Sequence, residues 1–357
     1  MNIFEYVDKY KDYTFDEKEF NEVDNVIFST LSYVDYSFIV PFNKRNKITL
    51  KDAANKYLSS HFKSKLNIIA VKEALKLLKK VKDAKRYENI LLYSYKYIGN
   101  EESQFSAITF EINRNLCYVA FEGTDQLISG WKEDCKMAYM FPVEAHKKAI
   151  KYLNHNFLFS NKKIIVGGHS KGGNLALVSA MYCNYFVNNK IIKVYSNDGQ
   201  GLRKSQIESK NYLKIKDRLI SIIPQYSIVG LLLRHDTNYT VIHSVKMGAI
   251  AHCTSYWKVD NDHFVRDKLS KFSKVLDEGI IKWLDKYDDE MREKFVNSVF
   301  RTLEENNIKS ITQIKQDKKL IFKILKSTKY MDPIVSDMMK DLFMIINKTN
   351  REYLWIK

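Results

Sequence analysis

Proline and glycine are scarce in this chain, whose 357 residues include 4 prolines and 12 glycines. So few helix-breaking and turn-forming residues argue against long flexible linkers and low-complexity arms. A repeat of fixed period is also lacking, which argues against a solenoid or a propeller. Since 45% of the residues are apolar, we expect an ordinary globular protein with a large buried core.

Cysteine is rare as well, with four residues at Cys117, Cys135, Cys183 and Cys253. None belongs to a CxxC pair, and the amino terminus lacks the apolar region of a secretory signal. A disulfide framework or a metal site is therefore the weaker interpretation. The longest apolar-rich run, Leu219–Leu233, is interrupted by polar residues and is shorter than the roughly 20 residues of a membrane-spanning helix. We expect a reduced, soluble, cytoplasmic protein.

Acidic residues are fewer than basic ones, 42 against 58, so the formal charge is +16. That charge raises nucleic acid or an anionic membrane as a partner. The lysines are spread among acids and no nucleic-acid module is visible, so we expect no nucleic-acid binding. The segment Ile68–Arg86 has an apolar face opposite a lysine-rich face, which predicts an amphipathic helix. We favour a surface helix packed on the core; the alternative is peripheral contact with an anionic membrane.

Three sections of the chain differ in pattern. Residues 1–100 are mostly helical in spacing and predict an N-terminal extension, and residues 263–357 predict a helical C-terminal extension that packs on the core or covers its site. Residues 101–262 alternate short apolar runs with helical segments, which predicts a mostly parallel central sheet flanked by helices. The predicted strands are Phe105–Ile112, Leu116–Phe121, Lys162–Val166, Ile191–Ser196, Leu219–Ile223 and Tyr239–Val245.

The sequence GHSKG at residues 168–172 is the most informative segment. It is a G-x-S-x-G placed between a buried strand and a helix that is apolar nearly all round. In this context the serine, Ser170, sits on a sharp turn that exposes its Oγ, and the flanking glycines let strand and helix approach. The start of the helix offers backbone N–H groups to a developing oxyanion. The alternative is a glycine-rich turn with an idle serine.

A second segment, VAFEGTD at residues 119–125, is a strand that ends in Gly-Thr upstream of the serine. In hydrolases with this kind of elbow, a loop at this point supplies the second donor of the oxyanion hole. We therefore predict the Lys171 N–H as the first donor. Thr124 is predicted as the second, through its backbone, its hydroxyl or both.

These segments carry a family resemblance. VAFEGTD, GWKED and VGGHSKGGNLAL resemble the class-three triglyceride lipases of the α/β-hydrolase superfamily. More closely, the chain is similar to an uncharacterised bacterial family of lipase-like hydrolases, through FNEVDNVIFSTLSYVDYS, NDGQGL, PQYSIVGLL and a final histidine region. The resemblance covers most of the chain. It implies the α/β-hydrolase fold and an acyl-enzyme formed on Ser170.

The general base is expected beyond the last strand of the core. His252 follows the strand pattern in the loop where the fold delivers its base, so we place it first. His263, at the start of the helical tail, is the reserve. His243 lies inside a strand pattern and His235 comes too early, so structural roles are favoured for both.

The acid of the triad is harder to assign. Class-three lipases carry an aspartate after the strand that corresponds to Leu219–Ile223, but Ser227 stands about there in this chain. Two acids remain as candidates. Asp198 ends the strand after the nucleophile helix, a position that some lipases use, and Asp236 lies farther along the expected loop. We place Asp198 first, and its alternative is an Asp-Gly turn.

The function predicted from these residues is hydrolysis of an ester, with a lipid or acyl ester first and a thioester or amide as alternatives. His252 acts as base and Ser170 as nucleophile, and the chemistry requires no metal or organic cofactor. The apolar segment Ile228–Leu233 is interpreted either as an acyl-binding wall or lid, or as core. The rival interpretation of the whole chain is a catalytically silent hydrolase scaffold that acts as a binding protein.

Overall fold

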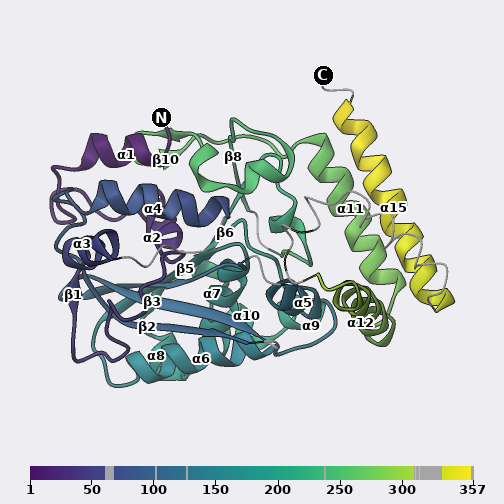
Figure 1. Cartoon of the computed structure of the whole chain (residues 1–357), viewed down its shortest axis with the longest axis horizontal. Helices are drawn as coiled ribbons and strands as arrows, with labels where there is room; N and C mark the ends of the chain where they lie inside the picture. Colours follow the sequence, from purple (N-terminus) through teal and green to yellow (C-terminus); the bar gives the residue numbers. More distant parts are fainter. Residues whose placement is uncertain are drawn as a thin grey trace.

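The computed structural model describes residues 1–60, 68–100, 103–125, 128–236, 239–308, 310, 313 and 332–354. Within these residues an eight-stranded sheet forms the centre of the molecule, with its strands in chain order (Figure 1). They are β1 (Ile48–Thr49), β2 (Leu91–Gly99), β3 (Gln104–Asn113), β4 (Leu116–Phe121), β5 (Lys163–His169), β6 (Ile191–Asn197), β7 (Leu219–Pro224) and β8 (Thr240–Ile242). Strands β1 to β4 pair antiparallel and β4 to β8 pair parallel. The predicted α/β class, with a mostly parallel sheet, is confirmed.

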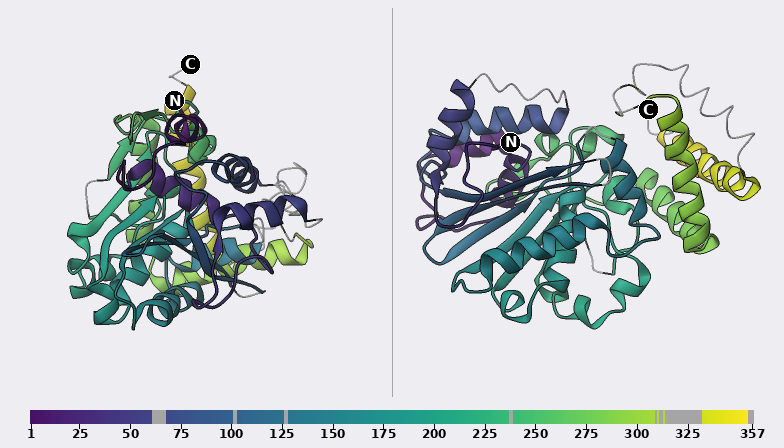
Figure 2. Two further views of the ribbon diagram at one scale, coloured as in Figure 1. Left: turned by 90° about the vertical axis from the view of Figure 1, so that its left-hand side faces the viewer. Right: turned by 60° about the horizontal axis from the view of Figure 1, so that its bottom comes forward.

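The sheet is covered on both faces because apolar residues alternate along its strands. In β4, Tyr118 and Ala120 join one buried cluster, whereas Val119 and Phe121 join the other. Figure 2 shows helices of the N-terminal segment along one face and α6 and α7 along the other. The helices on the first face are α1 (Ile3–Tyr10), α2 (Glu22–Leu31), α3 (Leu50–Ser59) and α4 (Ile69–Val81). Those after β4 are α5 (Ile128–Lys136), α6 (Glu144–Phe157), α7 (Lys171–Tyr182), α8 (Tyr185–Asn188), α9 (Lys204–Ile207) and α10 (Lys210–Leu213).

The segment before residue 101 contributes strands as well as helices. Both β1 and β2 come from it, and β2 pairs with β3 across a register shift between Tyr93 and Lys96. At this shift Ser94 adopts a positive φ of 55°, as residues at β-bulges do. The sheet therefore begins ahead of the predicted core of residues 101–262, and the division into extensions and core stays a prediction.

The amphipathic segment forms α4, which packs on the core rather than standing apart. Its buried residues Val71, Leu77 and Leu78 belong to the same apolar cluster as α2. Two lysines of this segment form ion pairs. Lys80 binds Asp8 of α1 at 2.6 Å, and Lys82, just after the helix, binds its neighbour Asp83. These contacts agree with the surface-helix interpretation that the sequence favoured.

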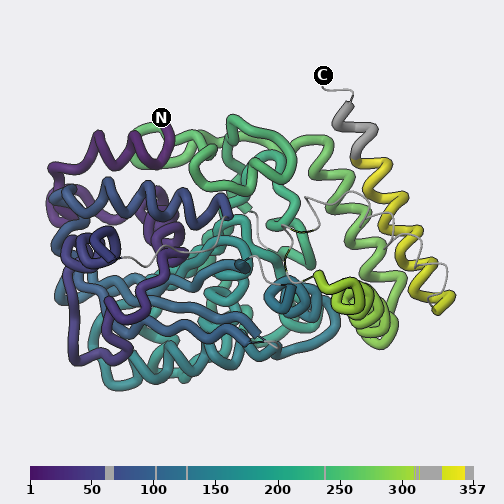
Figure 3. The backbone as a smooth tube through the Cα atoms, viewed as in Figure 1, coloured from purple at the N-terminus to yellow at the C-terminus, as the bar shows by residue number. Residues whose placement is uncertain are grey.

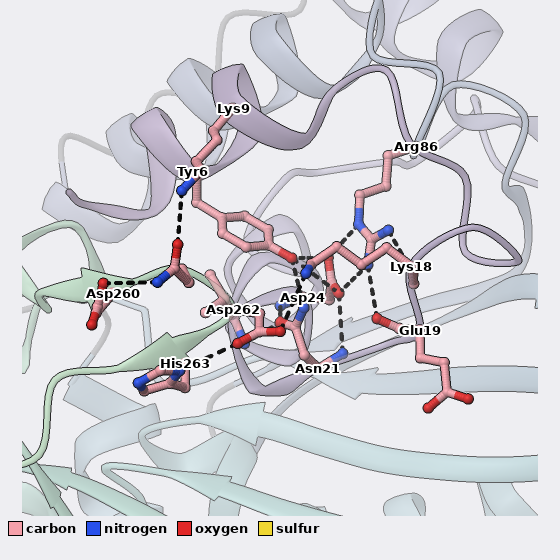
Figure 4. Close-up of polar contacts among 12 residues, drawn as sticks. Tyr6, Lys9, Lys18, Glu19, Asn21, Asp24, Arg86, Asp260, Asp262 and His263 are labelled. Carbon is pink, nitrogen blue, oxygen red and sulfur yellow. Dashed lines mark hydrogen bonds and ion pairs between the residues drawn. The ribbon is translucent and has the colours of Figure 1, made fainter.

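A fully buried ion pair ties the N-terminal segment together (Figure 4). Arg86 and Asp24 are both 0% exposed, and Arg86 Nη2 lies 2.6 Å from Asp24 Oδ2. The guanidinium also donates to backbone carbonyls at residues 14, 18 and 19, and the Tyr87 hydroxyl donates to Asp24 at 2.6 Å. Because every hydrogen-bonding position of the guanidinium is used, this buried charge is fully compensated.

After the core the described chain is helical, with α11 (Lys271–Lys286), α12 (Asp289–Glu305) and α15 (Pro333–Leu354). Figure 3 shows α11 and α15 side by side at one end of the molecule. Asp332 caps α15 by accepting the Ile334 N–H at 2.8 Å, which is the helix start that Asp-Pro predicts. Helix α12 packs on α5 through an apolar cluster that includes Ile128 and Phe300. None of the helices in the described residues is long and apolar enough to cross a membrane.

Candidate active site

The turn between β5 and α7 holds Ser170 in a strained conformation, with φ 59° and ψ −132°. A positive φ is uncommon for a residue with a side chain, and such strain gathers at functional sites. The turn is kept by the Ser170 N–H, which donates to the Asn197 carbonyl at 3.0 Å. A Cβ on Gly168 would lie 2.3 Å from the backbone of Gly172, and one on Gly172 would lie 2.1 Å from the Phe121 carbonyl oxygen. Strand and helix therefore require both glycines of the motif.

His252 and Asp198 form a hydrogen-bonded pair beside this turn. His252 ends a short 3-10 helix, η3 (Gly248–His252), and its Nδ1 lies 2.6 Å from Asp198 Oδ2. Asp198 follows β6 directly, and β6 pairs with β5 so that Asn197 is opposite His169. The residues after these two partners are Asp198 and Ser170, so neighbouring parallel strands bring both residues to the same edge of the sheet. The His252 ring lies 4.3 Å from the His169 ring, centroid to centroid. Among the described residues, no hydrogen bond joins Ser170 Oγ to His252 Nε2.

The Asp198 carboxylate is buried, and its second oxygen has donors of its own. Oδ1 accepts from the Ser227 hydroxyl at 2.5 Å and from the Gly230 N–H at 3.1 Å. Asp198 has a positive φ of 48°, which aims the side chain out of the strand direction. The segment Ile228–Leu233 thus contacts the Asp198 carboxylate through its backbone; Leu231 and Leu233 within it are buried, whereas Ile228, Val229 and Leu232 are half-buried, so the choice between an acyl-binding wall and core stays open.

The other candidates have different partners. Asp236 forms an ion pair with Lys216 at 2.7 Å, and both side chains are more than a third exposed. His243 and His263 each contact an aspartate near the surface. His235 is enclosed, and burial lowers its pKa to about 4. Among the candidates that the sequence left open, the structure brings His252 and Asp198 together.

The two predicted oxyanion donors lie on segments that pack against each other at the elbow. The Thr124 hydroxyl donates to Asp134 Oδ2 at 2.5 Å, so the hydroxyl is engaged and the backbone N–H is the group left for a substrate. Within the described residues, neither the Thr124 N–H nor the Lys171 N–H makes a hydrogen bond. Free backbone donors at this place are what an oxyanion requires.

Gln104 holds the loop that carries Thr124, a contact that was not predicted from the sequence. Its amide Nε2 donates to the Gly123 carbonyl at 3.3 Å, while its Oε1 accepts the Asp125 N–H at 3.1 Å. The Trp131 indole N–H then donates to the Asp125 carbonyl at 3.1 Å. One side-chain amide therefore spans the residues on both sides of Thr124. The sequence around Gln104 gives no hint of this contact. Gln104 is the first residue of β3, and only the antiparallel pairing of β3 with β4 brings it to the end of β4.

The side chain of Lys171 is buried beneath the same loop, with 1% exposure. Its Nζ lies 2.6 Å from Glu133 Oε2, 3.6 Å from Asp134 Oδ1 and 3.1 Å from the Gln104 carbonyl. Burial opposes ionisation of Glu133, but the charge and hydrogen bond of Lys171 outweigh it and lower the Glu133 pKa. Burial raises the pKa of Asp134 to about 6, against the opposing charge of Lys171. Lys171 thus links the start of α7 to α5 and to Gln104 through a buried ion pair.

A metal ion has no evident ligand set here: within the described residues, no group of three or more His, Cys, Asp or Glu side chains is arranged to hold one. The arrangement places a serine on a strained turn near a histidine that is hydrogen-bonded to a buried carboxylate.

Comparison with known proteins identifies relatives at the level of family. The model of the Mbeg1-like family matches residues 81–301, and this match confirms the resemblance drawn from the sequence. Among solved structures, M37 lipase is 17% identical with a TM-score of 0.33, over 58% of this chain and 68% of the lipase. A fungal lipase, solved as an inhibitor complex, is 13% identical with a TM-score of 0.27, over 42% of this chain and 65% of that chain. A comparison with curated proteins gives no match.

Proposed function

The chain belongs to the Mbeg1-like family, and we propose that it is a serine hydrolase that cleaves a carboxylic ester through an acyl-enzyme on Ser170. The observation that carries this proposal is the 2.6 Å hydrogen bond from His252 Nδ1 to the buried carboxylate of Asp198. A carboxylate on Nδ1 fixes the imidazole tautomer, so Nε2 is the nitrogen that accepts a proton. An idle serine on a glycine-rich turn would not account for this pair beside it.

The reaction proceeds in two halves. His252 Nε2 takes the Ser170 proton as Oγ bonds to the ester carbonyl carbon, and the carbonyl electron pair moves to oxygen. The Lys171 and Thr124 N–H groups hold that oxyanion. Collapse breaks the bond to the alcohol, which leaves with the proton from His252. Water, deprotonated by His252, then repeats the addition at the acyl carbon and releases the carboxylic acid and free Ser170.

The lack of a hydrogen bond between Ser170 and His252 within the described residues does not exclude this route. Catalytic hydrogen bonds are often long or poorly aligned in free enzymes and tighten when substrate binds. We propose an ester of a lipid or acyl chain as substrate, because the motifs of the oxyanion loop and elbow resemble those of lipases. Peripheral contact of α4 with an anionic membrane stays a secondary proposal.

The test is fluorophosphonate labelling of the full chain together with hydrolysis of a short p-nitrophenyl ester. We expect labelling and turnover in the wild type and neither in Ser170→Ala, while Ser205→Ala, at an exposed serine outside the site, keeps both. His252→Ala should lose at least about a hundredfold in labelling rate, since a general base contributes that much. A folded wild type that does not label would contradict the proposal and favour a silent scaffold that binds its ligand without cleaving it.

A further inference from the structure

Tyr33 and His169 are buried beside the proposed site but take no part in the reaction described above. Tyr33 lies in the segment that follows α2. His169 is the residue directly before the nucleophile. The Tyr33 hydroxyl lies 3.0 Å from His169 Nδ1, and His169 Nε2 lies 2.8 Å from the His252 carbonyl oxygen.

The direction of these hydrogen bonds is fixed by the chemistry of the partners. A carbonyl oxygen only accepts, so His169 Nε2 must carry a proton. Burial, and next the neighbouring His252, lower the pKa of His169 well below its ordinary value, so the ring is neutral. Its Nδ1 is then an acceptor, and the Tyr33 hydroxyl is the donor. The tyrosine thereby selects the tautomer in which His169 can bind the carbonyl of His252.

A second ring N–H holds the same loop. Trp257 Nε1 donates to the Ala251 carbonyl at 2.8 Å, and the Trp257 ring contacts the His169 ring at 6.1 Å between centroids. Two consecutive carbonyls, at residues 251 and 252, are therefore fixed by buried donors. The backbone that carries the base has little freedom to move away from the elbow.

Tyr33 also touches the oxyanion loop. A Cβ placed on Gly123 would lie 2.0 Å from the Tyr33 hydroxyl oxygen, so the hydroxyl packs directly against that glycine. One tyrosine from the N-terminal segment therefore contacts the residue before Thr124 and the residue before Ser170. Through His169 it also reaches the loop of His252.

We propose that Tyr33 and His169 are positioning residues that set His252 relative to Ser170, an inference that rests on the proposed hydrolase function. The chain of donors runs from the Tyr33 hydroxyl to His169, and from His169 to the His252 main chain. The His252 ring, free at Nε2, shuttles the proton while its backbone stays in place. The neutral His169 ring, whose centroid lies 4.3 Å from that of His252, adds no positive charge to oppose the imidazolium that forms.

The experiment compares Tyr33→Phe with a matched control. Tyr152→Phe is suitable, because Tyr152 is also buried and its hydroxyl pairs with Thr109 at 2.8 Å, in α6 away from the pair. We expect Tyr33→Phe to lower kcat on the order of tenfold with KM little changed, since a buried acceptor loses its donor. Tyr152→Phe should keep the wild-type kcat. Nitrogen-15 NMR of the His169 ring should show the Nε2–H tautomer in the wild type and, in Tyr33→Phe, a shifted Nδ1 resonance because that nitrogen has lost its donor.

A conservative replacement separates positioning from packing. Glutamine can place an N–H donor near the histidine Nε2 position, whereas leucine fills space without a donor. His169→Gln should therefore keep most of the labelling rate and His169→Leu should lose it. Tyr33→Phe with wild-type kcat, or an Nδ1–H tautomer in the wild type, would overturn the inference while leaving the hydrolase intact. A wild type that does not label overturns the proposed function, and the catalytic role of this pair with it.

Discussion

The Ser227 hydroxyl donates a hydrogen bond to Asp198. Ser227 stands at about the chain position where the resemblance to class-three lipases places an aspartate. The carboxylate that pairs with His252 thus comes from the end of β6, and the loop after β7 supplies a donor to it. A serine at position 227 is compatible with an intact pair of acid and base. The chain lacks the aspartate expected after β7, and the carboxylate that pairs with His252 comes instead from the residue after the neighbouring strand β6.

Replacing Asp198 should therefore damage catalysis far more than replacing Asp236. Asp198→Asn removes the charge that orients His252 and stabilises its protonated form, so we expect kcat to fall by about 10²–10⁴. Asp236→Asn, which breaks an exposed ion pair with Lys216, should stay within twofold of the wild type. Ester hydrolysis by both variants at matched protein concentration measures the difference. Equal losses would remove Asp198 from the mechanism.

Replacing Gln104 should weaken binding of the transition state and leave substrate binding nearly unchanged. Gln104→Glu keeps an acceptor for the Asp125 N–H but sets a carboxylate against the Gly123 carbonyl. A displaced Thr124 N–H should cost about 10²-fold in kcat, as loss of one oxyanion donor does. Affinity for a trifluoromethyl ketone, which becomes an oxyanion on binding, should fall in parallel. If that affinity stays at the wild-type value, Gln104 does not position the loop.

Removing the Lys171 charge should destabilise the fold. Lys171→Met leaves Glu133 and Asp134 buried without their cation, and we expect a loss of about 3–5 kcal/mol in the free energy of unfolding by urea. Adding Glu133→Gln to Lys171→Met should recover part of that loss, because one uncompensated charge is gone. Lys294→Met, which breaks an exposed helical pair with Glu290, is the control and should change stability by under about 0.5 kcal/mol. A double variant no more stable than Lys171→Met would argue against coupling between the two side chains.

Glu122 should make the fold less stable as pH rises. Burial, with smaller contributions from the Asp125 and Asp35 charges, raises its pKa from 4.5 to about 8, although the charge of Lys171 opposes the shift. The folded state then holds a proton that the unfolded state has released, so stability declines between about pH 4.5 and pH 8. Glu122→Gln should match the wild type at pH 4 and exceed it at pH 9, in thermal unfolding followed by circular dichroism. A variant with the wild-type pH dependence would show that Glu122 ionises normally in the folded protein.

The elbow could be predicted from the sequence because its determinants are local. Two glycines, a serine and the apolar strand and helix around them lie within about twenty residues, and each has one steric purpose. The strands of the core were found in the same way. Strand β2 was not predicted, because the bulge at Ser94 breaks the alternation of its apolar residues within a section of helical spacing.

The supports of the site could not be predicted, because each depends on contacts between distant parts of the chain. Gln104 meets Gly123 across an antiparallel register, and Tyr33 meets His169 from the segment that follows a helix covering the sheet. Nothing in their own neighbourhoods marks either residue as special. Chain order allowed both Asp198 and Asp236 as the acid. Only the folded structure shows that Asp198 contacts His252, whereas Asp236 pairs with Lys216.

The buried pair of Arg86 and Asp24 has a consequence for any attempt to dissect the chain. The family match begins at residue 81, so a fragment cut there retains the guanidinium and discards the carboxylate and the three carbonyls that receive it. It also discards Tyr33 and the helices that cover one face of the sheet. Such a fragment would expose apolar surface around the unpaired Arg86 guanidinium, and we expect it to aggregate. A fragment that keeps this ion pair and its carbonyl partners must therefore begin before residue 14, although the family match starts only at residue 81.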